Sequence, residues 1–125
     1  MERETRLMPE QQQKGMVIER VNALSPERME ETATLFCSAY NGIPPWHELY
    51  TQQESRAKME GYRKKEGFRL FCARIEDRPV GMAIVANSDT ENYRFLQEIF
   101  VDQGYRNSEY KVGSTLLASV MEDSA

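Results

Sequence analysis

The stretch from Arg94 to Met121 constrains the fold of this chain more than any other part. Its apolar, β-prone run over 95–101 predicts a strand that is covered on both faces. Residues 102–111 show no apolar period and predict a loop. The apolar residues that follow recur at the spacing of one helix face, and they are Val112, Leu116, Leu117, Val120 and Met121. The stretch therefore predicts a strand, a polar loop and an amphipathic helix in direct succession.

The predicted helix opens with small residues, Gly113, Ser114 and Thr115. Small side chains let a ligand approach the backbone, and the free N–H groups of a helix start attract an anion. Strand–loop–helix units are common, so this pattern alone indicates only a candidate phosphate site.

Cap signals and apolar alternation predict the other elements. Ser25 and Pro26 indicate the start of one helix, and Thr51 caps another. The predicted elements are a strand over 16–21, helices over 26–41 and 52–65, strands over 68–75, 80–86 and 95–101, and a helix from 112 onward. This order, β-α-α-β-β-β-α, indicates an α/β (α+β) fold in which consecutive strands form an antiparallel meander.

Length and composition limit the possible classes of protein. At 125 residues the chain holds one domain, predicted over 16–125, while the polar stretch 1–15 predicts a flexible N-terminal extension. The net charge of −4 without an isolated Lys/Arg run argues against nucleic acid as a partner. No apolar run reaches a bilayer-spanning length and no signal peptide is evident, so we expect a cytoplasmic protein without a membrane partner. Two cysteines and a single histidine make a metal site improbable and predict reduced thiols.

The sequence V-D-Q-G-Y-R-N-S-E-Y-K-V-G-S-T-L-L resembles the acyl-CoA-binding segment of the GNAT superfamily of N-acyltransferases. In that family a strand ends in Val-x-Pro, and Tyr-Arg, a Gly-x-Gly turn and a helix opening Gly-Ser-x-Leu-Leu follow. Gln103 stands where the family has Pro, Lys111 stands at the first Gly of the turn, and two extra residues precede Gly113. The matching residues are Val101, Tyr105, Arg106, Gly113, Ser114, Leu116 and Leu117.

The resemblance covers residues 16–125, about the first two-thirds of the family fold. It implies a GNAT-like mixed sheet that lacks the C-terminal strands, which a second copy or another chain would supply. It also implies acetyl transfer from acetyl-CoA, as cosubstrate, to a primary amine of a small molecule or peptide. The residues it implies for acetyl-CoA binding are Phe100, Val101, Arg106, Asn107, Ser108, Lys111, Val112, Gly113 and Ser114. A catalytically inactive GNAT-like binding or interaction module is the alternative.

Glu98 is the candidate general base, because a carboxylate that interrupts an apolar strand requires a reason. A structural ion pair with Arg94 or Lys111 is an equally weighted explanation. Gln97 is the second candidate, in the role of orienting a water molecule.

The proline-rich stretch before residue 50 places Trp46 and His47 on a loop between the helices. Trp46 either fills a packing gap or lines the acceptor pocket that the resemblance implies there. His47 either serves as a base or has no role.

Overall fold

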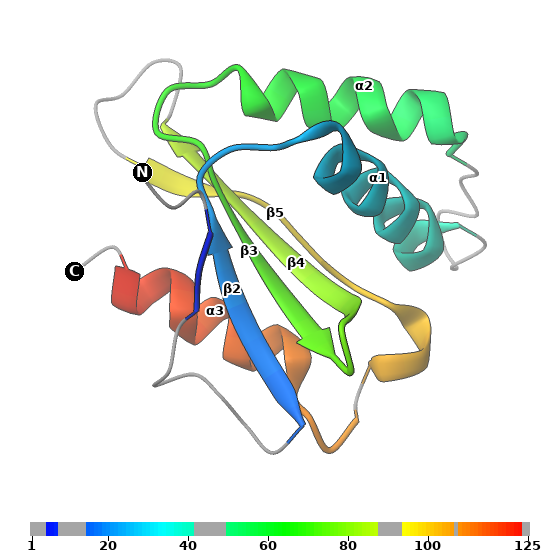
Figure 1. Cartoon of the computed structure of the whole chain (residues 1–125), viewed down its shortest axis with the longest axis vertical. Coiled ribbons are helices and arrows are strands. Elements are labelled where there is room, and N and C mark those ends of the chain that lie inside the picture. Colours follow the sequence, from blue (N-terminus) through cyan, green and yellow to red (C-terminus); the bar gives the residue numbers. More distant parts are fainter. Residues whose placement is uncertain (1–4, 8–14, 42–49, 88–93, 107, 124–125) are drawn as a thin grey trace.

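A single antiparallel sheet separates two layers of helices in this protein (Figure 1). The computed structural model describes residues 5–7, 15–41, 50–87, 94–106 and 108–123. Helices α1 and α2 cover one face of the sheet, and α3 covers the other. The elements are β1 (Thr5–Leu7), β2 (Met16–Val21), α1 (Pro26–Tyr40), α2 (Gln52–Arg63), β3 (Arg69–Ile75), β4 (Arg78–Asn87), β5 (Arg94–Val101), the 3₁₀ turn η2 (Gln103–Tyr105) and α3 (Val112–Asp123). The predicted order is confirmed from β2 to α3.

The strands of the described sheet lie in chain order, β1-β2-β3-β4-β5, and all four pairings are antiparallel. The predicted meander of the last three strands is confirmed. A parallel pairing, which would make the sheet mixed, does not occur among the described strands. No helix in the described ranges is both long and apolar enough to span a bilayer.

Both predicted helix starts are confirmed. The Ser25 side chain accepts a hydrogen bond from the N–H of Arg28 at 3.2 Å, with Pro26 in the first helical position. Thr51 and Glu54 form a reciprocal capping box, with two hydrogen bonds of 3.0 Å. These caps satisfy N–H groups that the first turn of a helix would otherwise leave without acceptors.

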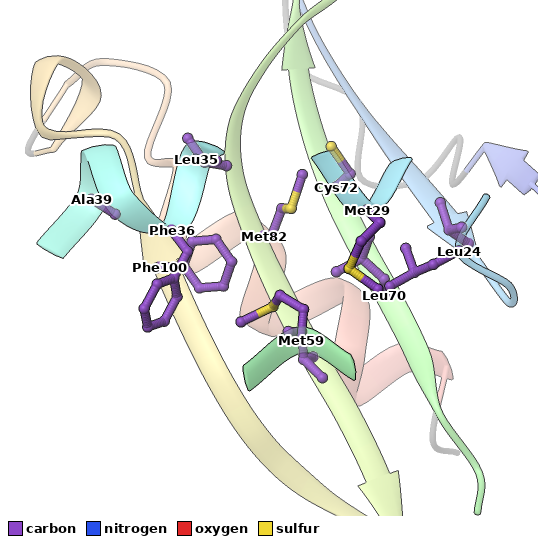
Figure 2. Close-up of a cluster of buried hydrophobic side chains, with 12 residues drawn as sticks. Leu24, Met29, Leu35, Phe36, Ala39, Met59, Leu70, Cys72, Met82 and Phe100 are labelled. Carbon is purple, nitrogen blue, oxygen red and sulfur yellow. The ribbon is translucent and has the colours of Figure 1, made fainter. Parts of the chain in front are cut away.

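The β3–β4 hairpin carries apolar side chains to both layers. Its two turn residues, Glu76 and Asp77, both have positive φ, as two-residue hairpin turns with the right twist require. Alternate residues of β3 then pack toward opposite sides, Leu70 and Cys72 against α1 and α2, and Phe71 toward α3. Figure 2 shows the buried cluster on the α1 and α2 side.

The predicted extension over 1–15 contains a strand, so the expectation of no secondary structure there is wrong for Thr5–Leu7. These residues pair with β2, Thr5 opposite Val21 and Leu7 opposite Glu19. The edge of β2 presents unpaired backbone N–H and C=O groups, which an extended segment can satisfy whatever its side chains are. Three residues are too few to leave a recognisable period in the sequence.

Both faces of β5 pack against a core cluster, as predicted, through Ile99 and Val101 on one side and Phe100 on the other, but the cover is incomplete. β5 is the edge strand of the described sheet, and Phe100 is buried while residues 96–99 and Val101 are half-buried. An apolar run shows that a strand packs against something, and it does not show whether the strand is central or at an edge.

The buried face of α3 differs from the predicted one. Leu117 and Met121 are 43% and 66% exposed, whereas Thr115 and Ser119 are buried. The two hydroxyls can be buried because each donates a hydrogen bond to a carbonyl four residues earlier, at 2.8 and 3.0 Å. Of the five predicted contact residues, Val112, Leu116 and Val120 are buried, so apolarity alone placed three correctly and two incorrectly.

A glycine in β4 allows α3 to lie close to the sheet. A Cβ at Gly81 would stand 2.5 Å from Cγ1 of Val112 and 3.1 Å from Cδ1 of Leu116. Both of those residues belong to the core between α3 and the sheet. The missing side chain at Gly81 therefore sets how closely the first turn of α3 approaches β4.

Gly81→Ala should lower the free energy of unfolding by roughly 1–3 kcal/mol, because the added methyl group overlaps Val112 in a close-packed core. The double variant Gly81→Ala/Val112→Ala should recover part of that loss, which urea unfolding would measure. Gly61→Ala is the control, since nothing lies within 4 Å of a Cβ there; it should instead gain up to about 1 kcal/mol of helix propensity. An equal loss of unfolding free energy in Gly81→Ala and Gly61→Ala would contradict this explanation.

Candidate functional site

An open pocket of about 780 Å³ lies where β5, the end of α1, the 102–111 loop and the start of α3 meet. Seven of the nine predicted cofactor-binding residues line it, together with three residues that were not predicted. The lining residues are Tyr40, Ile99, Val101, Tyr105, Arg106, Ser108, Lys111, Val112, Gly113 and Ser114. The fold therefore brings the predicted segment together around one cavity.

One predicted cofactor residue of the described chain, Phe100, does not line this pocket. Phe100 is 2% exposed and points to the opposite face, where its ring meets that of Phe36 with 5.3 Å between centroids. Asn107 lies outside the described residues, as do Trp46 and His47. The unpredicted members Tyr40 and Ile99 come from elements outside the loop, and only the tertiary structure places them there.

The first turn of α3 presents backbone N–H groups to the pocket. Val112, Gly113 and Ser114 precede the first N–H that bonds within the helix, that of Thr115, which donates to the Lys111 carbonyl at 3.0 Å. No acceptor among the described residues bonds to the earlier three N–H groups. Together with the helix dipole, these groups favour an anion in the pocket.

Lys111, which stands at the first glycine of the family's Gly-x-Gly turn, has a backbone conformation that favours glycine. Its φ is 50°, in the left-handed region that glycine adopts at least cost. The residue at this position thus differs from the family sequence, and its backbone is one that glycine would adopt more easily. It also adds a cation to the lining of the pocket.

Gly113 has no evident role in packing. A Cβ at this position would meet only Cγ2 of Val101, at the ordinary contact distance of 3.8 Å. A helix interior also disfavours glycine relative to alanine. The open backbone at Gly113 thus leaves room for a molecule in the pocket.

Arg106 and Gln103 fasten the loop to the end of α1. Arg106 donates to the carbonyls of Val101, at 3.1 Å, and Ala39. The Gln103 amide donates to the carbonyls of Ser38, at 2.8 Å, and Asn41, at 3.0 Å. The last carbonyls of a helix lack intrahelical partners, so the loop acts as a C-terminal cap for α1. This explains the glutamine that stands at the family's proline position.

Glu98 lies on the α1 and α2 side of β5, and its carboxylate accepts hydrogen bonds from two tyrosine hydroxyls. Tyr40 donates to Oε1 at 2.7 Å and Tyr62 donates to Oε2 at 2.8 Å, while Nζ of Lys58 is 4.0 Å from Oε2. Burial, and then the hydrogen bond to Glu98, raises the pKa of each tyrosine. Among the side chains that the structure describes, the partners of Glu98 are these three residues and not Lys111, while the side chain of Arg94 lies outside the described residues. Glu98 itself is not a lining residue of the pocket.

Gln97 is the extra residue of a β-bulge in β5. Glu98 lies opposite Ile84 and Leu96 lies opposite Val85, so Gln97 has no partner across β4. Its side-chain nitrogen is buried and has no hydrogen-bond acceptor in the described part of the chain. The bulge bends β5 beside the pocket, as bulges at sheet edges often do.

The described residues contain no group of three or more His, Cys, Asp or Glu side chains placed to hold a metal ion. Cys37 and Cys72 are free thiols.

The pocket, its helix start and the order of elements together define a known family. The family model of the GNAT acetyltransferases matches residues 29–124. The chain belongs to the GNAT acetyltransferase family. No curated protein matches the sequence.

Solved structures show the same fold at low sequence identity. A Pyrococcus horikoshii OT3 protein is 20% identical with a TM-score of 0.68, covering 86% of this chain and 70% of that one. The ribosomal-protein-S18-alanine N-acetyltransferase of Escherichia coli is 15% identical with a TM-score of 0.61, and the match covers 86% of this chain and 58% of that one. An aminoglycoside N-acetyltransferase solved with CoA is 20% identical with a TM-score of 0.58, and the match covers 86% of this chain and 67% of that one.

Lys111→Gly should raise the free energy of unfolding by about 0.5–1 kcal/mol, because glycine adopts the left-handed backbone without steric cost. Lys111→Ala keeps a Cβ in that conformation and should give no such gain. Urea unfolding of both variants measures the difference. A glycine variant that is less stable than the alanine variant would show that relief of backbone strain does not control stability at this position.

Proposed function

We propose that this chain carries the acetyl-CoA site of an N-acetyltransferase that acts on a primary amine of a small molecule or peptide. The observation that carries the proposal is the start of α3, where the N–H groups of 112–114 have no acceptor in the described chain and border the pocket. Membership of the GNAT family supports it, since that family uses acyl-CoA. One structural neighbour was solved in complex with CoA.

The pyrophosphate of CoA has the charge and size that the start of α3 favours. Gly113 leaves its backbone open to approach, and the Lys111 ammonium adds a positive charge at the rim. The edge of β5 offers backbone groups that no described strand pairs, and an extended amide chain such as pantetheine can bond to a strand edge. The pocket lining therefore fits both the charged and the extended part of the cosubstrate.

Acetyl transfer requires a deprotonated amine beside the thioester. Glu98 is the proposed final proton acceptor, and Gln97 is the residue proposed to orient a water molecule; its buried side-chain nitrogen at the bulge, with no acceptor in the described chain, supports this proposal. Trp46 and His47 remain the proposed contribution to the acceptor side. The backbone near Phe100 and Val101 is the proposed donor to the oxyanion that forms during attack.

A second copy or another chain is the proposed partner that covers the open parts of this one. The β5 edge of the described sheet is unpaired, and Leu117 and Met121 leave an apolar strip on α3. Exposed strand edges and apolar patches favour association. The pairing is a proposal that the oligomeric state in solution tests.

A GNAT-like module that binds without catalysis is the second candidate. The observation in its favour is Arg106, whose guanidinium donates to two backbone carbonyls and so is committed to the fold. Binding would then depend on Lys111 and the helix start alone. Measurement of acetyl-CoA affinity and of transfer in the same preparation separates the two candidates.

Gly113→Ala should weaken acetyl-CoA binding at least about tenfold, because a methyl group would occupy the space beside the N–H groups of the first turn. Gly113→Val should abolish binding, because its β-branched side chain blocks more of the backbone. Isothermal titration calorimetry gives the dissociation constants, and urea unfolding should show that Gly113→Ala is no less stable than the parent.

Gly61→Ala in α2 is the matched control, since it is also a helical glycine but does not belong to the pocket lining. It should bind acetyl-CoA as the parent does. An unchanged dissociation constant in Gly113→Ala would place the cosubstrate elsewhere.

A further inference from the structure

We propose that the Tyr40 hydroxyl takes the proton from the acceptor amine and passes its own proton to Glu98. The inference rests on the proposed acetyl transfer, and it assigns a role to a residue at the end of α1 that the sequence did not indicate. Tyr40 lines the pocket, whereas Glu98 does not. The proposed route from the pocket to the carboxylate therefore runs through Tyr40, whose hydroxyl bonds to Glu98.

The geometry around Tyr40 connects the pocket to the carboxylate in one step. Its hydroxyl donates to Oε1 of Glu98 at 2.7 Å and also lies 3.4 Å from the carbonyl of Ile99. A phenol that donates its proton still has an acceptor lone pair. That lone pair can receive a proton from an amine in the pocket.

Packing holds the Tyr40 ring in this position. Its centroid lies 4.7 Å from that of Phe36, 6.3 Å from that of Tyr50 and 6.3 Å from that of Phe100. Removal of the hydroxyl alone would leave these ring contacts in place. Tyr40→Phe is therefore a change of chemistry with little change of packing.

Tyr62 provides a matched comparison in the same carboxylate. It donates to Oε2 at 2.8 Å, from α2, and does not line the pocket. Tyr40 and Tyr62 are thus both half-buried, and their hydroxyls bond to the same carboxylate at similar distances. Only Tyr40 also lines the pocket. Any purely structural effect of a lost hydrogen bond to Glu98 should be similar for both.

Among the described residues, the charged and titratable groups that face this pair come from α2 and from the 102–106 loop. α2 contributes Lys58 and Tyr62, and the loop contributes Arg106, whose charge opposes the upward shift in the Tyr40 pKa. The shift itself comes first from burial and then from the hydrogen bond to Glu98. Tyr40 therefore stays protonated at neutral pH and is able to donate a hydrogen bond to Glu98.

In the proposed step the Tyr40 oxygen accepts a proton from the protonated amine while the Tyr40 proton moves to Oε1 of Glu98. One N–H bond and one O–H bond break, and two O–H bonds form, so Tyr40 remains neutral. The freed nitrogen lone pair attacks the thioester carbonyl, the C–S bond breaks, and the thiolate takes the second proton that nitrogen releases. Glu98, with a side chain 18% exposed, then returns its proton to solvent.

The test compares Tyr40→Phe with Tyr62→Phe in the 125-residue chain. Each variant is assayed for acetyl-CoA binding by calorimetry and for acetyl transfer to two kinds of nucleophile. A panel of primary alkylamines and a peptide with a free α-amine are protonated at neutral pH. Hydroxylamine is already neutral there and needs no base.

Tyr40→Phe should lose about 100-fold or more in transfer to the protonated amines, which is the usual scale of general-base catalysis. Its acetyl-CoA dissociation constant and its transfer to hydroxylamine should stay within a few-fold of the parent. Its rate with alkylamines should keep rising with pH, as more amine loses its proton in solution. Tyr62→Phe should show a loss of several-fold at most, equal for both kinds of nucleophile.

Equal losses in the two variants, or an equal loss toward hydroxylamine and the alkylamines in Tyr40→Phe, would overturn the relay. A parent chain that binds acetyl-CoA and transfers acetyl to neither kind of nucleophile would also overturn it, while the binding site itself would stand. A parent chain that does not bind acetyl-CoA would overturn the proposed function, and the relay with it.

Discussion

The close approach of α3 to Gly81 is the constraint on which the rest of the site depends. Because β4 has no side chain there, Val112 can lie against the sheet, within 2.5 Å of where a Cβ would stand. The first turn of the helix is thereby fixed beside the end of β5, and its free N–H groups face the pocket. A larger residue at Gly81 would move the helix outward, and the anion site would lose its position relative to the strand. The packing of one glycine thus determines where the proposed cosubstrate site lies.

β5 joins the two layers of the protein at this point. Ile99 and Val101 contact the pocket on the α3 side, while Glu98 and Phe100 face α1 and α2. Tyr40 connects the two sides of the strand, since its hydroxyl bonds to Glu98 and the residue also lines the pocket. The 102–106 loop strengthens the connection because it caps the end of α1, so that α1, β5 and the binding loop hold one another in place. The proposed binding and proton-transfer groups are therefore parts of one connected structure.

The sequence predicted the elements whose signals are local. Capping residues at Ser25 and Thr51, the β3–β4 hairpin and the strand–loop–helix unit were all correct, because each depends on neighbours in the chain. The predictions that failed depend on contacts between distant segments: the pairing of β1 with β2, and the burial of Thr115 and Ser119 in place of Leu117 and Met121. For the site, the motif residues of the loop line one pocket, and their role in binding remains a prediction. Motif spacing could not identify Tyr40, which is 58 residues from Glu98 in sequence and carries no motif.

The central claim is that acetyl-CoA binds at the start of α3, and backbone NMR of the ¹⁵N-labelled chain tests it most directly. At 14.5 kDa the chain is small enough for assignment of its amide resonances. On titration with acetyl-CoA, the amides of Val112, Gly113 and Ser114 should shift most, with smaller changes along β5 and almost none in α2. The claim would be contradicted by the largest shifts appearing in α2 or on the outer face of α1, or by no shift at millimolar acetyl-CoA.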